Sequence, residues 1–187
     1  MSRPLAPRRA PSRLALLSNS RATLKFLKFS RTKQTFLCMY CVKMMRNQSQ
    51  PFSRAELNAA LIQASATGDV EDVNQLLHEG ADVRAHNNYA LRSASQNGHV
   101  AVVYRLMQVP GMSVHDVVAQ DNFALKMASE NGHYAVVDLL LQVQGLTTDD
   151  VRAGDNFALK SARQNGHAAV VNRLSEALME TYATHFS

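Results

Sequence analysis

The sequence predicts an all-α fold, a solenoid of about four stacked helix-turn-helix units that follows a basic N-terminal leader. Three observations lead to this prediction. A stretch of 19 residues recurs three times without gaps, at intervals of 34 residues. Apolar residues within each copy recur at the spacing of one helix face. The chain contains no Trp and only 6% aromatic residues, so we expect a core of small and aliphatic side chains.

The three clear copies cover residues 88–106, 122–140 and 156–174, and 11 of their 19 columns are identical. A more divergent copy precedes them, in which Gly68 corresponds to Gly98, 30 residues later. An atypical first unit is expected at the end of a solenoid, where one face has no neighbour.

Each copy is predicted to form two helices. In the copy that starts at residue 122, the first helix spans Phe123 to Glu130 and ends at Asn131-Gly132, because Gly tolerates the left-handed backbone of a helix end. The second helix spans about His133 to Gln142. Its apolar stripe consists of Val136, Val137, Leu140 and Leu141. Neither helix can bury its stripe alone, so the units must stack.

The connectors between copies carry helix-start signals. Ser113 and Thr147 each stand three residues before an Asp, the pattern of a helix N-terminus with an acidic first turn. We therefore expect a short helical turn in each long connector. The shorter interval after the first copy, which contains residues 80–83, leaves room only for a tight turn.

These elements resemble the ankyrin repeat family, whose unit is roughly 33 residues of turn and two helices. The matching elements are Leu-x-x-Ala, Gly-His and Val-Val-x-x-Leu in order, with Gly-Ala-Asp-Val at residues 80–83, and they cover about two thirds of the chain. The family's Thr-Pro-Leu-His is replaced here by segments that begin at Tyr89, Phe123 and Phe157. An aromatic side chain is therefore expected to cover each turn corner. This variant is similar to ankyrin proteins of intracellular bacteria and large viruses, some of which enter host cells.

The resemblance implies a non-catalytic scaffold that binds another protein, acting as an adaptor or effector. Ankyrin proteins bind partners through their turn tips and the exposed side of the first helix. The candidate partner-binding residues are therefore Arg84, His86, Asn87, Arg92, Gln96, Gln120, Asp121, Lys126, Glu130, Arg152, Asp155, Lys160 and Gln164. Among these, Arg92, Lys126 and Lys160 repeat at one position, where they either engage an acidic partner or are solvated helix-start charges.

No residues are nominated as catalytic, cofactor-binding or metal-binding. His99, His133 and His167 recur once per unit, and stacked helices lie about 8–10 Å apart, so the three cannot share a metal ion. We expect them to pack and to cap the start of the second helix. Cys38 and Cys41 have C-x-x-C spacing but lack a second pair, so they are interpreted as incidental thiols.

Charge divides the chain into a leader at 1–52 and a repeat domain at 53–182. Residues 1–55 contain 12 of the 20 Lys and Arg residues and no Asp or Glu, which leaves a net charge of −7 on the remainder. The leader is expected to be disordered or weakly helical. It is either a mitochondrial transit peptide, a basic arm for nucleic acid or anionic membrane, or translated sequence upstream of a start at Met39, Met44 or Met45.

No run of about 18 apolar residues occurs, so no membrane span is expected. A cytoplasmic location is predicted, in a host cell for an effector, or a mitochondrial one if the leader is a transit peptide. A monomer is favoured. The alternative is a structural subunit, because the end of the stack near residues 174–182 exposes apolar surface unless it folds back as a cap.

Overall fold

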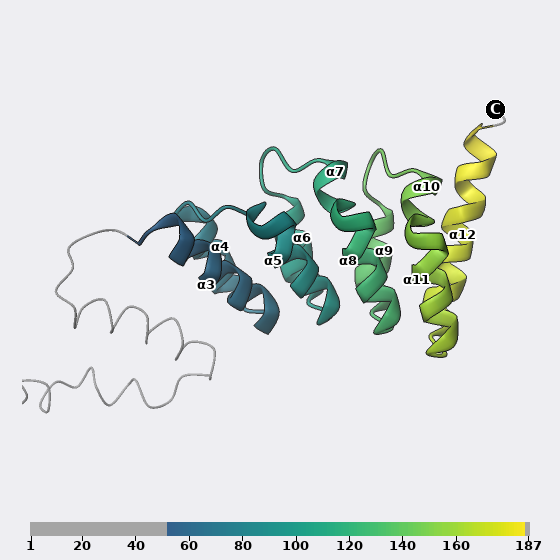
Figure 1. Ribbon diagram of the computed structural model, residues 1–187, viewed down its shortest axis with the longest axis horizontal. Helices are drawn as coiled ribbons and strands as arrows, with labels where there is room; N and C mark the ends of the chain where they lie inside the picture. Colours follow the sequence, from purple (N-terminus) through teal and green to yellow (C-terminus); the bar gives the residue numbers. More distant parts are fainter. Residues whose placement is uncertain (1–51, 186–187) are drawn as a thin grey trace, which may run out of the picture. The chain divides into compact units, whose positions relative to one another are not determined.

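The structure, a computed structural model, describes residues 52–185, and their side chains as far as Met179. The expectations about the leader, its cysteines and its start concern residues outside this range, and the boundary at residue 52 stays a prediction. All regular elements of the described range are helices, in agreement with the predicted fold class (Figure 1). No helix in this range is long and apolar enough to cross a bilayer.

Four pairs of helices follow one another along the stack (Figure 1). The pairs are α3 (Arg54–Thr67) with α4 (Val70–His78), α5 (Ala85–Gln96) with α6 (Val100–Met107), α8 (Ala119–Glu130) with α9 (Tyr134–Leu141), and α11 (Ala153–Gln164) with α12 (Ala168–His185). The first helices of successive pairs pack against one another, and so do the second helices. The prediction of about four stacked units is therefore confirmed.

Two short helices, α7 (Val114–Val117) and α10 (Thr148–Val151), lie in the long connectors at one edge of the stack (Figure 1). Each begins as the sequence predicts. The Asp116 carboxylate accepts a hydrogen bond of 2.9 Å from the backbone N–H of Ser113, and Asp150 accepts the same bond from Thr147. This arrangement satisfies N–H groups that a helix start otherwise leaves without partners.

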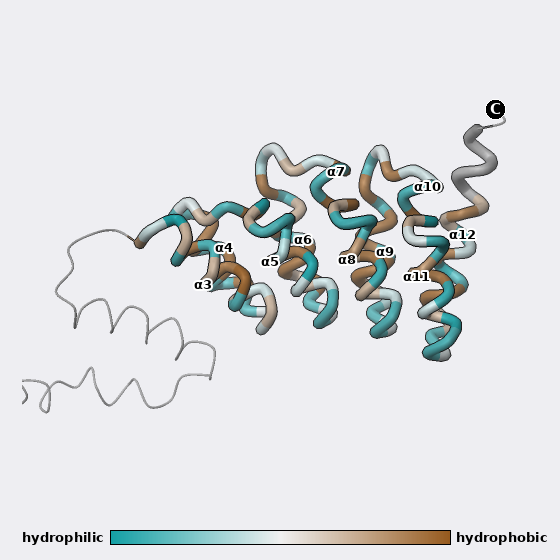
Figure 2. Tube along the Cα trace, in the orientation of Figure 1, coloured by the Kyte–Doolittle hydropathy of each residue, from teal (hydrophilic) through white to brown (hydrophobic). Residues whose placement is uncertain are grey.

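The repeated apolar columns form the core. Its fully buried side chains include Leu91, Val102, Val103, Leu106, Leu125, Val136, Val137, Leu140 and Leu174. Complete burial of one such side chain contributes about 1.5–3 kcal/mol. Figure 2 shows hydrophobic segments along the paired helices, whereas the turns that join α5 to α6, α8 to α9 and α11 to α12 are mostly hydrophilic. Leu159, in the last pair, is only half-buried because no further pair covers it.

The last helix differs from its equivalents in length, since α12 has 18 residues and α9 has 8. Leu174 and Ala177 are buried, but Met179 is 71% exposed. Residues 174–182 continue α12 and do not fold back over the end of the stack.

Candidate binding face

The first helices α5, α8 and α11 each begin with one turn of left-handed backbone. The left-handed residues are His86–Asn88, Gln120–Asn122 and Gly154–Asn156, with φ between +53° and +65°. This conformation costs an L-residue roughly 1–2 kcal/mol, and Asn, Asp and Gly tolerate it best. Those three residue types occupy seven of the nine positions. The composition of the turns therefore suits their backbone.

The third residue of each left-handed turn anchors it. The backbone N–H of Asn122 donates to the Val118 carbonyl at 2.7 Å, and its side-chain amide donates to the Asp150 carbonyl of the next connector at 3.2 Å. Asn88 and Asn122 are both buried. The first two residues of each turn are exposed, so each unit presents a pair of side chains or backbone groups from a fixed position.

Behind the turns, cations and aromatic rings alternate along the first helices. The Arg92 guanidinium lies 4.9 Å from the ring centroid of Tyr89 and 5.2 Å from that of Phe123, which belongs to the next unit. Its Nη2 also donates to the His86 carbonyl at 3.0 Å. Cation–π attraction at such distances contributes about 0.5–1 kcal/mol at exposed sites. Arg92 therefore joins two units.

The same pattern continues into the last two units with weaker contacts. The Lys126 ammonium lies 5.9 Å from the ring centroid of Phe157, and Lys160 forms an ion pair with Asp155. Within residues 52–179, no carboxylate lies within ion-pair distance of Lys126. We call this row the cation–ring ladder; it consists of Tyr89, Arg92, Phe123, Lys126, Phe157 and Lys160.

The ladder changes two expectations. A solvated charge does not describe Arg92, because the residue is half-buried and its guanidinium contacts two rings. The aromatic side chains do not simply cover the turn corners, since Tyr89 is 47% and Phe157 is 39% exposed. The rings instead contact the cations, and their remaining surface faces solvent.

The repeated histidines join each unit to the one before it. The Nε2 atoms of His99, His133 and His167 lie 2.9 Å from the carbonyl oxygens of Ala66, Gln96 and Glu130, respectively. A carbonyl only accepts, so Nε2 is the donor. These carbonyls belong to the last turn of the preceding unit's first helix, where the helix leaves carbonyls unpaired. None of these bonds caps the histidine's own helix.

A glycine makes room for each of these histidine rings. A Cβ atom at Gly98 would lie 2.6 Å from His133 Nδ1, and Gly68 and Gly132 contact His99 and His167 in the same way. We call each pair a Gly–His clasp. The predicted packing role of the histidines is confirmed, but the predicted capping of the second helix is wrong for His99 and His133, which make no such bond.

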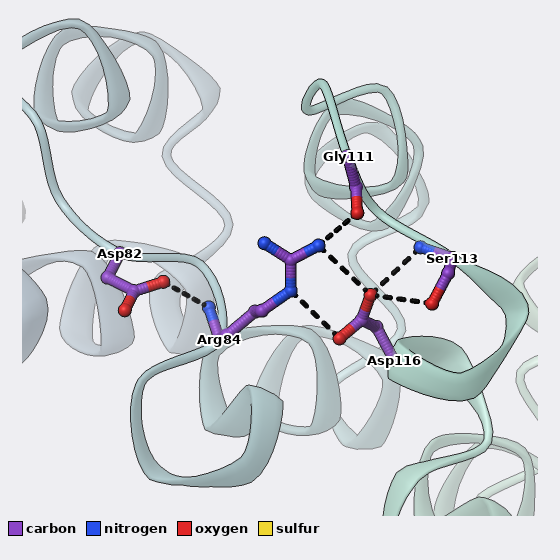
Figure 3. A network of polar contacts seen from close by, with 5 residues as sticks. All are labelled: Asp82, Arg84, Gly111, Ser113 and Asp116. Atoms are coloured by element: carbon purple, nitrogen blue, oxygen red, sulfur yellow. Dashed lines mark hydrogen bonds and ion pairs between the residues drawn. The ribbon is translucent and has the colours of Figure 1, made fainter.

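Arg84 spans the first turn and the following connector (Figure 3). Its Nε donates to Asp116 Oδ1 at 2.9 Å, its Nη2 donates to Asp116 Oδ2 and to the Gly111 carbonyl, and its backbone N–H donates to Asp82. The hydrogen bond from Arg84 is the main cause that lowers the pKa of Asp116, and hydrogen bonds from Ser113 lower it further. The Arg84 guanidinium therefore joins the first turn to the following connector at Gly111 and Asp116.

The candidate residues fall into two groups in the structure. The exposed group comprises His86, Asn87, Gln96, Gln120, Asp121, Asp155 and Gln164, of which Asp155 forms an ion pair with Lys160. The group with internal contacts or partial burial comprises Arg84, Arg92, Lys126, Glu130, Arg152 and Lys160, of which Arg84 and Lys160 form ion pairs with carboxylates of this chain. Their role in partner binding stays a prediction.

No group of three or more His, Cys, Asp or Glu side chains in the described part of the chain is arranged to hold a metal ion. His99, His133 and His167 each contact a different unit, as their spacing predicts. The candidate binding face therefore consists of the left-handed turns and the exposed sides of the first helices, whose polar side chains differ from unit to unit.

Residues 61–152 match the family model described as "Ankyrin repeats (3 copies)". These residues are ankyrin repeats. The match agrees with the helix pairs, and the same columns continue through the last ankyrin unit to Leu174. Ankyrin repeats are typically protein–protein interaction modules rather than catalysts. No curated protein matches the chain, so the likeness to bacterial or viral ankyrin proteins stays a prediction.

Several features of the ankyrin units escaped prediction from sequence. The left-handed turns had a signal, because Asn or Asp occurs in the first turn of α5, α8 and α11, together with Gly154 in one of them. The ion pair of Arg84 with Asp116 had none, because the two residues are 32 positions apart and occur in only one pair of units. Tyr104 and Tyr134, which are 55% and 46% exposed on the second helices, also had no distinguishing pattern.

Proposed function

We propose that this protein is a non-catalytic scaffold that binds another protein through its left-handed turns and the exposed side of its first helices. The proposal rests on the distribution of differences between the units. Buried columns such as Leu91 and Leu125 are identical, whereas the exposed turn positions differ. His86 in one unit corresponds to Gln120 in the next and to Gly154 in the third.

Rigidity supports the same proposal. The turns are anchored by the backbone N–H groups of Asn88, Asn122 and Asn156, and one of them also by the buried side chain of Asn122. The units are joined by the Gly–His clasps and the cation–ring ladder. A preorganised face loses little conformational entropy when it binds, so more of the contact energy contributes to affinity. The binding face is expected to keep its shape between the free and the bound protein.

A photo-crosslinking residue tests the location of this face. It is placed in the full chain at Gln96, which is exposed at the end of α5, or at Asn172, which is exposed on α12. We expect specific protein adducts in cell extract from position 96 and none from position 172. Equal labelling from both positions, or none from either, would remove the support for this face.

A second candidate function concerns the basic leader. Its 11 Lys and Arg residues without any acid favour contact with nucleic acid or an anionic membrane through residues 1–52. Such binding should weaken steeply between low and moderate salt, because it releases counterions. If deletion of residues 1–52 left the binding unchanged, the leader would not be its cause.

Narrower roles rest on the resemblance alone. They are that the protein acts as an adaptor, or as an effector within a host cell, that it is located in the cytoplasm, and that it works as a monomer. Sedimentation over a range of concentrations tests the last of these, because a constant mass supports the monomer.

A further inference from the structure

We propose that Arg92 and Lys126 of the cation–ring ladder, with the rings beside them, bind an extended acidic segment of the partner, in polyproline II conformation, with carboxylates at positions i and i+3. This inference rests on the proposed scaffold function and specifies the chemistry of the partner. It follows from the charge, the spacing and the partial burial of Arg92 and Lys126.

Two adjacent cations of the ladder lack an acidic partner. Within residues 52–179, Arg92 and Lys126 contact aromatic rings but form no ion pair, whereas Lys160 is neutralised by Asp155. Each of the two is half-buried, so an arriving carboxylate would meet a partly desolvated charge. The rings also hold Arg92 in one position, which lowers the entropy cost of pairing.

The separation of these cations selects the form of the segment. Arg92 and Lys126 are 34 residues apart and occupy the same position in neighbouring units. Packed helices lie about 8–10 Å apart. A polyproline II helix has three residues per turn and rises about 3.1 Å per residue, so residues i and i+3 lie on one side about 9.3 Å apart. Its carboxylates therefore match the two cations.

Aromatic surface completes the site. Tyr89 and Phe157 flank the two cations and are 47% and 39% exposed. Aromatic-lined grooves are a recurring means of binding polyproline II segments, because such segments lose little entropy on binding. Apolar residues at positions i+1 and i+2 of the segment can contact this ring surface.

Other occupants fit less well. The leader of this chain carries no acid before Glu56, so it cannot supply carboxylates to Arg92 and Lys126. Single-stranded nucleic acid needs open ring faces for base stacking, but Arg92 lies against both Tyr89 and Phe123.

The test uses the full chain and a labelled synthetic peptide that contains Glu-Pro-Pro-Glu in a Pro-rich frame. Fluorescence anisotropy at low salt should show binding about tenfold tighter than that of the same peptide with both Glu replaced by Gln, because two ion pairs are lost. Moving the second Glu to i+4 should weaken binding about threefold, since it turns that carboxylate away from Lys126 and leaves the first Glu paired with Arg92.

Matched variants of the protein test whether Lys126 contributes to the tighter binding of the Glu peptide. Lys126→Gln should weaken binding about threefold, whereas Lys160→Gln, at the equivalent position of the next unit, should change it less than twofold because Lys160 is already paired. Circular dichroism confirms that both variants fold. Equal effects of the two substitutions, equal binding of the Glu and Gln peptides, or equal competition by an oligothymidylate would overturn the proposal.

The peptide-binding test and the crosslinking test of the scaffold function can give different outcomes. If position 96 crosslinks a protein but the Glu peptide does not bind, the scaffold function stands and the acidic segment is rejected. If neither occurs, both are rejected.

Discussion

The Gly–His clasp can be broken with an unusually close control within the same molecule. Gly98 and Gly166 occupy equivalent positions in their units and have the same φ of +76°. A Cβ at Gly98 would lie 2.6 Å from Nδ1 and 2.8 Å from Cε1 of His133, whereas a Cβ at Gly166 would meet nothing within 4 Å. The substitutions Gly98→Ala and Gly166→Ala therefore introduce the same backbone strain, but only Gly98→Ala disturbs a clasp.

The strain of an Ala in left-handed backbone, about 1–2 kcal/mol, cancels between the two variants. At position 98 the ring of His133 must move, which costs its hydrogen bond to the Gln96 carbonyl, about 0.5–1.5 kcal/mol. Overpacking against the ring adds about 1–3 kcal/mol. Gly98→Ala should therefore lower the free energy of unfolding by roughly 1.5–4.5 kcal/mol more than Gly166→Ala does.

Urea unfolding followed by far-UV circular dichroism measures this difference, because the chain has no Trp to serve as a fluorescent probe. A third variant combines Gly98→Ala with His133→Ala, which removes the ring that the added methyl group would strike. This double variant should recover part of the lost stability, so the two effects should not add. Equal destabilisation by Gly98→Ala and Gly166→Ala would refute the role of the clasp.

Three further predictions concern single contacts. Asp116→Asn should lower stability by about 0.5–1 kcal/mol near neutral pH, since Arg84 loses a partly exposed ion pair. The pKa of Asp116 is lowered in the folded protein, so the ion pair contributes fully at pH values above the ordinary pKa of 3.8. The contribution disappears as the pH falls through the folded pKa, so the stabilities of wild type and variant should converge in acid. A stability difference that stayed constant with pH would contradict this. Leu125→Ala should cost about 2–5 kcal/mol in urea unfolding, and Leu159→Ala, at the half-buried equivalent, clearly less. Asn122→Ala should destabilise more than Asn122→Gly, because only Gly adopts φ of +58° without strain; calorimetry would disprove this by giving equal melting temperatures.

The sequence predicted the stack because its information is periodic. Leu91 and Leu125 are fully buried, as their recurrence at 34-residue intervals indicates. The short helices in the connectors were also predictable, since Ser113 and Thr147 stand at helix-start spacing from an Asp. Such features depend on local propensity and on burial, which a single sequence expresses directly.

The location of the candidate face stays a prediction, and the contacts within it were not predictable from the sequence. That Arg92 lies between Tyr89 and Phe123 depends on side-chain direction across two units, which spacing alone does not reveal. His133 was expected to cap its own helix because it stands at that helix's start, yet its ring turns toward Gln96 of the preceding unit. Contacts that cross from one unit to the next are the ones that sequence patterns specify least.

Each ankyrin unit after the first carries both halves of a junction, a histidine that contacts the preceding unit and a glycine that can receive the histidine of the next. A segment such as residues 99–132 contains one complete set, His99 at one end and Gly132 at the other. In-frame duplication of that segment would therefore create a longer array in which every new joint is already complementary. The first unit has Asp69 in place of the histidine. New units can therefore be joined by a clasp within the array or at its C-terminal side, but not before its first unit.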